Sequence, residues 1–487
     1  MKRLARIEDL PATIAQPQYQ PDQHRAGIVH FGLGAFHRAH MAVYTDDVLA
    51  TDGGDWRITG ISLRSRAVRD HLQPQNGFFT LVERSEQGES YRIIGSVQDV
   101  LVAPENPEEV LQRLASSSIR IVSMTITEKG YLRDPASGAL MLEHPDIQHD
   151  LAHPEQPRTM HGFVVEALDR RRQQGGDAFT LLCCDNLPAN GAALSQLILE
   201  FAQHRDKTLA DWIAVNVVFP STMVDRIVPA TTPQDIVSVS AALGCRDEAP
   251  VICEPFSQWV IEDRLPEIRP AWEKFGATLV AEVAPYEEMK LRLLNGSHSA
   301  LAYLGYLGGF DYIHQVVADP DYLLFIQSMM YEEVVPTLQI PAEVDIAAYC
   351  QTLIKRFKNT TLQHRTWQIA MDGSLKIPQR LLDTVRNRIV ARAPYPHLAL
   401  AIAGWLRYVT GVDEAGNGIE VSDPFAGRLC SIADKHAANV PAYIKGVVQI
   451  REIFGTDLSA DADFHNEIGF ALEKLYRIGA RRAVSSG

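Results

Sequence analysis

The segment Lys290-Leu-Arg-Leu-Leu-Asn-Gly-Ser-His298 places an amine, an amide and an imidazole close together in the sequence. On a regular α-helix, Asn295 lies roughly 140° and His298 roughly 80° around the axis from Lys290, so the imidazole falls between the other two groups. The three polar groups interrupt an apolar run, and buried polar groups need partners. The pattern is typical either of a satisfied buried network or of a proton-transfer site.

Lys290 has the chemistry of a general base if its surroundings are apolar. Desolvation disfavours the ammonium form of a lysine, and a neutral amine can accept the proton of an alcohol. The developing alkoxide needs donors, which neutral amides supply. Asn295 is one candidate, and Asn186 is another because it follows an apolar strand. An Asx-turn cap for Asn186 and a core imidazole for His298 are the alternatives.

A Gly-x-Gly turn near the N-terminus follows a short apolar strand expected at 27–31. Such a turn ahead of a helix lets backbone approach a pyrophosphate, although His37 replaces the third glycine of the dinucleotide fingerprint. We expect a nicotinamide dinucleotide to bind here, through Gly32, Gly34, Ala35 and Phe36. The roles of His37 and His40 stay open between a positive cluster at a phosphate and ordinary core or surface histidines.

The loop after the second expected strand, 56–63, bears on the choice between NAD and NADP. An acid at this place binds the ribose 2′-hydroxyl of NAD and repels the 2′-phosphate of NADP. This chain carries Arg64-Ser-Arg66 there and no acid. Two guanidinium groups favour a 2′-phosphate, so NADP is predicted as an alternative to NAD, unless the arginines form a solvated basic turn.

The order of elements predicts an α/β fold. Short apolar strands at 27–31, 56–63, 119–127 and 179–184 alternate with helical patterns such as 161–173 and 192–204. This alternation indicates a Rossmann-type, doubly wound, mainly parallel sheet. From about residue 285 the pattern becomes mostly helical. We therefore expect a dinucleotide-binding domain over residues 1–284 and a helical substrate and catalytic domain over residues 285–487.

Composition narrows the classes of partner. A net charge of −14 in 487 residues argues against nucleic acid, which requires a cationic footprint. There is no signal-peptide pattern and no apolar run long enough to span a membrane. The six cysteines lack metal or disulfide-framework spacing. We expect a cytoplasmic protein with reduced thiols, a small-molecule substrate and a monomeric state.

Three other enzyme classes fit the sequence poorly. Tyr286-Glu-Glu-Met-Lys290 matches the Tyr-x-x-x-Lys pair of short-chain dehydrogenases, but it lies too late in the chain and lacks an upstream serine at a sensible distance. No His-Glu-x-x-His or paired Cys-x-x-Cys motif suggests zinc, and no Gly-x-Ser-x-Gly elbow suggests a hydrolase. A metal-free dehydrogenase remains.

Six motifs resemble those of the polyol-specific long-chain dehydrogenases, the mannitol dehydrogenase family. They follow in order over essentially the whole chain, at 28–40 (IVHFGLGAFHRAH), 125–131 (TITEKGY), 184–191 (CDNLPANG), 219–227 (FPSTMVDRI), 253–256 (CEPF) and 289–298 (MKLRLLNGSH). The resemblance implies a Rossmann-type domain, a largely helical second domain and metal-independent, nicotinamide-dependent oxidation of a secondary alcohol.

The resemblance also implies roles for individual residues. Lys290 corresponds to the base, Asn186 and Asn295 to oxyanion donors, and His298 to an orienting residue. Asp225 matches a ligand of a substrate hydroxyl. Glu287 and Glu128 stand where a proton route to solvent is expected. A cofactor-binding sensor without turnover is the alternative from another class, and the filled catalytic positions argue against it.

The substrate branch is harder to choose, because features of two branches are mixed. Gln156-Pro-Arg-Thr and Asp185-Asn-Leu-Pro are similar to mannitol 2-dehydrogenases, whereas Glu128-Lys-Gly-Tyr and 364–380 are similar to fructuronate reductases. Lys376 matches a substrate-contacting lysine of the mannitol branch, and Gln368 replaces an arginine of that branch. Arg365 and Arg380 offer cations for a uronate carboxylate, unless they pair with surface acids. We therefore favour D-fructuronate and D-mannonate over mannitol and fructose.

Overall fold

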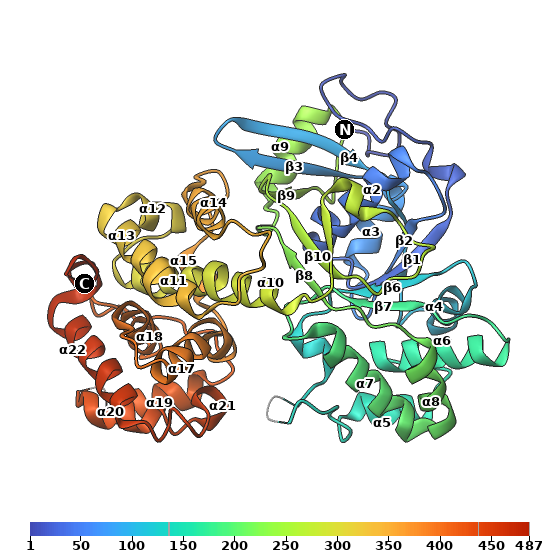
Figure 1. Cartoon of the computed structure of the whole chain (residues 1–487). Coiled ribbons are helices and arrows are strands. Elements are labelled where there is room, and N and C mark those ends of the chain that lie inside the picture. The colour runs from blue at the N-terminus through green and yellow to red at the C-terminus, as the bar shows by residue number, and fades with distance from the viewer. Residues whose placement is uncertain (135–136, 437, 487) are drawn as a thin grey trace. The chain divides into compact units, whose positions relative to one another are not determined.

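The computed structural model describes residues 1–134, 137–436 and 438–486 (Figure 1). The chain divides into two compact units, Met1–Ala284 and Pro285–Gly487. The first unit contains all the strands named below, and the second is built from helices. Each unit is described by itself.

The core of the first unit is a five-stranded parallel sheet with the strand order β5-β2-β1-β6-β7. Its strands are β1 (Ala26–Phe31), β2 (Arg57–Ser62), β5 (Val97–Val102), β6 (Ile121–Met124) and β7 (Thr180–Cys183). The strand order reverses at β1 and β6, and open α/β sheets bind ligands at such a switch point. The predicted doubly wound, Rossmann-type sheet is confirmed.

Helices cover both faces of this sheet because its strands are apolar on both sides. Val29 and Phe31 of β1 pack with the apolar side chains of α4 (Pro107–Ala115), α6 (Met160–Gln173) and α7 (Asn190–Arg205). Ile28 points to the other face, where it packs with α2 (Met41–Thr51). This alternation follows the two-residue period of a strand. The sheet therefore holds its strand ends, and the loops that follow them, in fixed places.

Two three-stranded sheets complete the strand structure of the first unit. One has the order β4-β3-β9, from β3 (Phe79–Ser85), β4 (Gly88–Ile94) and β9 (Val251–Cys253). The other has the order β11-β10-β8, from β8 (Thr222–Asp225), β10 (Gln258–Glu262) and β11 (Ala277–Val280). The remaining helices of four or more residues are α1 (Ala35–Ala39), α3 (Ala67–Leu72), η3 (Glu128–Tyr131), α5 (Pro145–Ala152), α8 (Lys207–Asn216), α9 (Pro233–Leu243) and η4 (Trp272–Phe275).

The second unit packs around α11 (Gly296–Leu307) and α18 (Pro396–Tyr408), which contact each other and are buried over most of their length (Figure 1). The chain enters this unit through α10 (Ala284–Met289). The other α-helices are α12 (Ile313–Ala318), α13 (Pro320–Ser328), α14 (Ile346–Lys358), α15 (Thr366–Ala370), α16 (Gly373–Ile377), α17 (Asp383–Val390), α19 (Ala426–His436), α20 (Val440–Val447), α21 (Arg451–Phe454) and α22 (Ala462–Ser485). The predicted mostly helical fold of this region is confirmed.

Three π-helical turns interrupt the helices of the second unit: η5 (Lys290–Asn295), η6 (Met329–Val334) and η8 (Pro378–Leu382). The sequence-based assumption of regular α-helical geometry at Lys290–Asn295 is therefore wrong. In η5 the backbone N–H of Gly296 donates to the carbonyl of Leu291, five residues earlier. Such turns are rare and occur often at functional sites.

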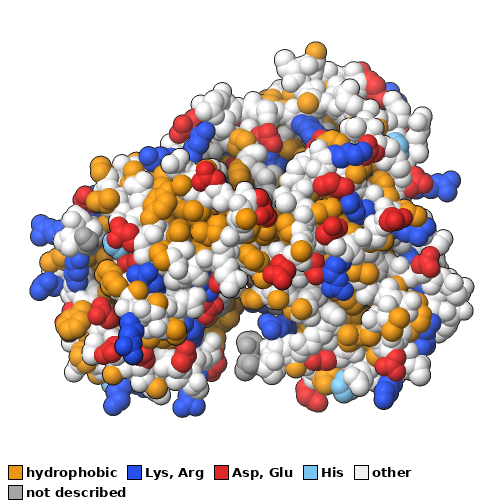
Figure 2. Space-filling model, viewed as in Figure 1, with side chains coloured by type: hydrophobic (Ala, Val, Ile, Leu, Met, Phe, Trp, Pro, Cys, Tyr) orange, Lys and Arg blue, Asp and Glu red, His pale blue; other side chains and the backbone are white. Residues whose placement is uncertain are grey.

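Charged side chains are mixed on the face of the molecule shown in Figure 2. Acidic and basic groups are interspersed there, and neither sign forms a continuous patch. Among the described residues, no helix has the length and apolarity that crossing a bilayer requires.

Candidate active site

The π turn η5 changes how the predicted polar groups of the second unit are arranged. In an α-helix, residues four apart stack along the axis, whereas the i→i+5 bonds of a π turn bring residues five apart onto neighbouring turns. Lys290 and Asn295 are five apart, so they follow one another along the helix instead of lying roughly 140° apart. The wide turn therefore places the amine of Lys290 and the amide of Asn295 closer to the same helix face than a regular α-helix would.

The three groups lie in a mostly buried setting. The side chains of Lys290 and His298 are buried, and Oδ1 of Asn295 is buried without a hydrogen-bond partner among the described residues. His298 lies on α11 with its ring centroid 5.1 Å from that of Phe357 and 4.7 Å from that of His364. Because the amide oxygen of Asn295 is not used by the fold, the polar end of this side chain is suited to a ligand.

Positive charge gathers around His298. Burial lowers the pKa of His298 well below its ordinary value, and His364, Arg380, Arg356 and Lys376 lower it further. Burial also lowers the pKa of His364 to about 4, with a smaller contribution from Lys376. Both imidazoles are therefore neutral near pH 7. They can exchange hydrogen bonds with a ligand while the nearby cations attract an anion.

Arg380 is held against the start of α11 by close backbone packing. A side chain at Gly296 would place its Cβ 2.7 Å from the carbonyl oxygen of Arg380, so only glycine lets η8 approach this closely. Nη1 of Arg380 donates to Oγ of Ser299 at 3.1 Å. Lys376 donates to the carbonyl of Met371 at 2.6 Å. The structure therefore brings Arg380 and Lys376 to the His298 region.

The other two predicted substrate ligands are more exposed. Arg365 precedes α15, and its guanidinium lies over the ring of Tyr312, 5.2 Å from the centroid. Gln368 lies exposed on α15. Neither side chain is among the largest causes of the pKa shift of His298. Their part in substrate binding stays a prediction.

The predicted site residues of the first unit follow three strands. Asn186 is exposed in the loop after β7, and Glu128 is the exposed first residue of η3, which follows β6. Asp225 is buried at the end of β8. Glu287 lies on α10 and is partly buried. Their roles stay predictions.

The Gly-x-Gly turn has the shape that a dinucleotide requires. Gly32 has φ +86°, and a Cβ on it would lie 2.1 Å from the carbonyl oxygen of Thr125, so glycine is required by the fold. A Cβ on Gly34 would meet only the carbonyl oxygen of Gly32, at 3.8 Å. The chain's own packing therefore does not demand glycine at position 34. A bare backbone there fits the close approach of a pyrophosphate, next to Ala35 and Phe36 at the start of α1.

The histidines after this turn belong to the core. His37 is fully buried, with its ring stacked 3.6 Å from that of His30, and burial lowers its pKa well below the ordinary value. Nε2 of His40 lies 3.0 Å from the carbonyl oxygen of Gln258, and its ring packs on Phe36. A neutral buried imidazole adds no charge to a phosphate site, which argues against a positive cluster at His37. Both ring nitrogens of His37 are buried without a hydrogen-bond partner among the described residues.

Arg64 and Arg66 are exposed in the loop between β2 and α3. Ser62 donates to the carbonyl of Ser65, and Oγ of Ser65 accepts from the N–H of Ala67 at 3.2 Å. Arg66 lies 3.5 Å from Asp70, an exposed pair of the kind that is worth little. The loop is thus ordered while its two guanidinium groups stay accessible to a 2′-phosphate.

Several residues near the site escaped the sequence prediction. Arg356 lies buried on α14 and affects His298, but on an amphipathic helix with Lys355 and Lys358 nothing marks it as special. Asp185 was read only as part of a motif, although its carboxylate accepts from two backbone N–H groups. Among the described residues, no group of three or more His, Cys, Asp or Glu side chains is arranged to hold a metal ion.

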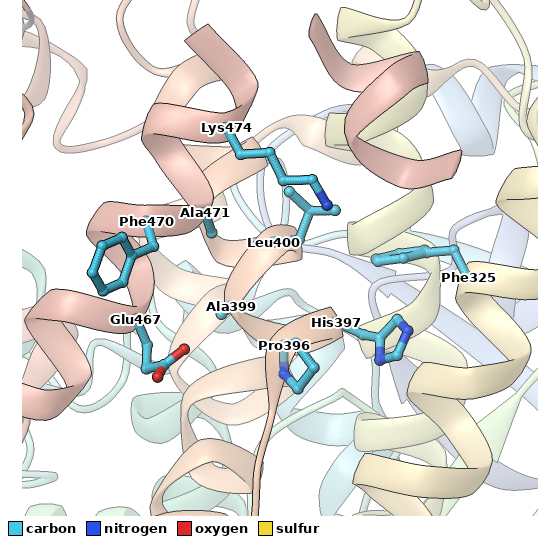
Figure 3. A pocket seen from close by; sticks show the side chains of 9 residues that line it. All are labelled: Phe325, Pro396, His397, Ala399, Leu400, Glu467, Phe470, Ala471 and Lys474. Carbon is cyan, nitrogen blue, oxygen red and sulfur yellow. The ribbon is translucent and has the colours of Figure 1, made fainter. Parts of the chain in front are cut away.

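A separate pocket of about 180 Å³ lies on the second unit among α13, α18 and α22 (Figure 3). Phe325 and Leu400 give it an apolar wall, and Glu467 and Lys474 are its charged members. None of the predicted site residues lines it. It is therefore distinct from the candidate active site.

Comparisons with known proteins agree over the whole chain. The family model of the mannitol dehydrogenase Rossmann domain matches residues 26–274, and that of the mannitol dehydrogenase C-terminal domain matches residues 282–476. D-mannonate oxidoreductase of Escherichia coli (strain K12) is 44% identical over 485 residues, which are 99% of each chain. Mannitol 2-dehydrogenase of Pyrenophora tritici-repentis (strain Pt-1C-BFP) is 43% identical, covering 96% of this chain and 82% of the relative. The solved ternary complex of Pseudomonas fluorescens mannitol 2-dehydrogenase with NAD and D-mannitol has a TM-score of 0.91 at 39% identity, covering 100% of this chain and 99% of that one.

Proposed function

The chain belongs to the mannitol dehydrogenase family, and from that premise we propose that this oxidoreductase interconverts D-fructuronate and D-mannonate. The observation that carries the choice of substrate is the positive charge that Arg356 and Arg380 add at His298, beyond Lys376, which matches a lysine of the mannitol branch. A sugar acid brings a carboxylate that these cations attract, whereas a neutral polyol brings none. D-mannonate oxidoreductase and mannitol 2-dehydrogenase are both among the relatives at nearly equal identity, so the choice rests on these cations.

The proposed chemistry assigns one task to each polar group. Lys290 accepts the proton of the substrate hydroxyl during oxidation and returns it during reduction. Asn295 and Asn186 donate hydrogen bonds to the oxygen that gains negative charge. His298, neutral near pH 7, orients that oxygen, and Asp225 binds another substrate hydroxyl. Glu287 and Glu128 pass the proton between Lys290 and solvent.

The Gly32–Gly34 turn is the proposed cofactor site. The residues present fit a nicotinamide dinucleotide, because Gly34 leaves room that the fold itself does not need. A dinucleotide held there supplies the carrier of the hydride. NAD is supported by the solved relative that binds it, and the exposed Arg64 and Arg66 support use of NADP as well.

The substrate assignment is tested by NADH oxidation with fructuronate or fructose as acceptor. We expect kcat/KM to be higher with fructuronate, and equal or better values with fructose would contradict the proposal in favour of a mannitol 2-dehydrogenase. In Arg380→Gln, we expect kcat/KM for fructuronate to fall roughly 10- to 100-fold, as the loss of a charged hydrogen bond predicts. The value for fructose should fall less.

A matched substitution separates this effect from a general loss of positive charge. Arg386 lies on α17 and pairs with Asp383 and Asp457. We expect Arg386→Gln to leave the ratio of the two kcat/KM values unchanged. If both variants change the ratio equally, Arg380 is not the carboxylate ligand.

The cofactor assignment is tested by binding, independently of turnover. We expect NADPH to bind to the wild type, and the double variant Arg64→Ala/Arg66→Ala to bind it roughly 10- to 100-fold more weakly with little change for NADH. Quenching of protein fluorescence measures both dissociation constants. Arg69→Ala is the control, since Arg69 pairs with Glu105 and Asp70. A strong NADH preference that the double variant does not alter would make the two arginines surface residues without a cofactor role.

A further inference from the structure

A partly buried hydrogen-bond network joins the three chain segments of the first unit that carry Glu128, Asn186 and Asp225. Its centre is the carboxylate of Asp185, next to Asn186 at the end of β7. Oδ2 accepts from the N–H of Ile126 at 2.8 Å, and Oδ1 accepts from the N–H of Thr127 at 3.3 Å. Both donors lie in the loop that leads from β6 to Glu128. The carboxylate thus ties that loop to β7.

The same carboxylate fixes the far end of η3. The hydroxyl of Tyr131 donates to Oδ2 of Asp185 at 2.7 Å and lies 2.9 Å from Sγ of Cys183. Glu128 and Tyr131 are the first and last residues of η3. Asp185 therefore holds this short helix at both ends, and Glu128 has little freedom to move relative to β7.

The loop before Glu128 is strained. Thr127 has φ +64° and ψ +161°, a conformation that is unfavourable for a β-branched residue. Such strain costs energy and persists only where the surroundings impose it, most often at functional sites. Here the hydrogen bond from the Thr127 N–H to Asp185 is one of the contacts that impose it.

A second side chain extends the network to β8. Nδ2 of Asn190 donates to the carbonyl of Asp185 at 3.1 Å and to the carbonyl of Thr222 at 2.8 Å, and its Oδ1 accepts from the N–H of Thr222 at 2.9 Å. Thr222 begins the strand that ends at Asp225. The next residue, Gly191, packs so tightly that a Cβ would lie 2.6 Å from the carbonyl oxygen of Phe219. The start of α7 is thereby locked to the start of β8.

We propose that Asp185 is a positioning residue of the active site: its carboxylate holds the loop that carries Glu128 against the end of β7, where Asn186 follows. Asn190 assists by joining the main-chain carbonyl of Asp185 to β8, the strand that ends at Asp225. The inference rests on the proposed function, because it assumes that these three residues serve the reaction. Asp185 touches no reacting atom in this proposal. It acts through the backbone that carries the other residues.

The charge state of Asp185 gives the proposal a testable pH dependence. Burial raises the pKa of Asp185 to about 6, its hydrogen bonds with Tyr131 and Ile126 lower it, and the charge of Glu128 raises it. Tyr131, Cys183, Cys184 and His161 are further titratable groups at this region. Burial raises the pKa of Tyr131 and of Cys184 well above their ordinary values and lowers the pKa of His161 to about 4. Above about pH 6 the carboxylate accepts all three hydrogen bonds. Protonation below that pH turns one oxygen into a donor and releases a backbone N–H.

The test compares Asp185→Asn with Asp150→Asn. Asp150 is also buried in the first unit and accepts hydrogen bonds from the N–H groups of Arg158 and Thr159 and from the hydroxyl of Thr159. Its Oδ1 also lies 3.2 Å from Nδ1 of His149. It is linked to none of the three proposed site residues. Both variants should unfold at a lower temperature. Only Asp185→Asn should lower kcat, roughly 10- to 100-fold, with NADH affinity within about two-fold of the wild type.

The pH profile of kcat/KM separates positioning from general stability. The wild type should lose activity as the pH falls through about 6, and Asp185→Asn should lack this acid limb. Tyr131→Phe removes a hydrogen bond that lowers the pKa of Asp185, so the limb should move to higher pH. Glu128→Gln removes a charge that raises this pKa, so the limb should move to lower pH.

These outcomes distinguish the two proposals. A kcat of Asp185→Asn equal to that of Asp150→Asn, or an acid limb that persists in Asp185→Asn, would overturn the positioning role while leaving the proposed function untouched. All rates are measured with an acceptor that the wild type reduces, whether fructuronate or fructose. If the wild type does not reduce fructuronate, this result contradicts the proposed function and leaves the test of Asp185 unaffected.

Discussion

Replacing Lys290 with alanine is expected to lower kcat roughly 10²- to 10⁴-fold, the usual contribution of a positioned general base. The side chain is buried on the π turn η5 beside an apolar run. Because Lys290 is assigned to proton transfer, the dissociation constant of NADH should stay within about three-fold of the wild type. Steady-state kinetics of mannonate oxidation and fluorescence titration of NADH measure the two quantities.

Lys290→Arg distinguishes a base from a simple positive charge. A guanidinium remains charged throughout the accessible pH range and cannot accept a proton from the substrate. If Lys290 is the base, the arginine variant should be nearly as inactive as the alanine variant, and small primary amines added to Lys290→Ala should restore part of its rate. High activity of Lys290→Arg would show that the position needs charge alone.

The sheet of the first unit could be predicted because its signals are local. Apolar strands such as 27–31 stand out against the helical patterns between them, and Gly32 marks the turn that follows the first strand. The observed strand β1 (Ala26–Phe31) differs by one residue at its start. The expected strand at 119–127 is shorter in the structure, as β6 (Ile121–Met124), because the chain turns after it to place Glu128 on η3.

The geometry of the candidate site could be predicted only in part. The sequence pattern identified Lys290, Asn295 and His298 as candidate residues. It could not predict the angles between them around the helix, because residue types do not distinguish a π turn from an α-helix. Arg356 comes near His298 only through the packing of α14, which is separated from η5 by about fifty residues of sequence. Long-range packing of this kind leaves no periodic signal in the residues themselves.

Asn295→Asp is expected to be more damaging to turnover than Asn295→Ala. Removing one donor from a developing oxyanion costs roughly 10²- to 10³-fold in kcat, and this is the expected loss for the alanine variant. Aspartate has nearly the same shape as asparagine but brings a negative charge toward the oxygen that is gaining one, so its kcat should be lower still. Because Oδ1 of Asn295 has no hydrogen-bond partner among the described residues, its loss in Asn295→Ala should not greatly alter the unfolding temperature.

The control for this pair is Asn439→Asp, the same chemical change elsewhere in the second unit. Asn439 caps α20 by accepting a hydrogen bond from the N–H of Ala442, and aspartate caps a helix equally well. The kcat of Asn439→Asp should match that of the wild type. This result would show that a lower kcat in Asn295→Asp comes from the position of the new charge and not from the added charge alone. If Asn295→Asp turned over faster than Asn295→Ala, the amide would not face the developing negative charge. Asn295 would then be a packing residue of η5, and stabilisation of the oxyanion would have to come from Asn186 and His298.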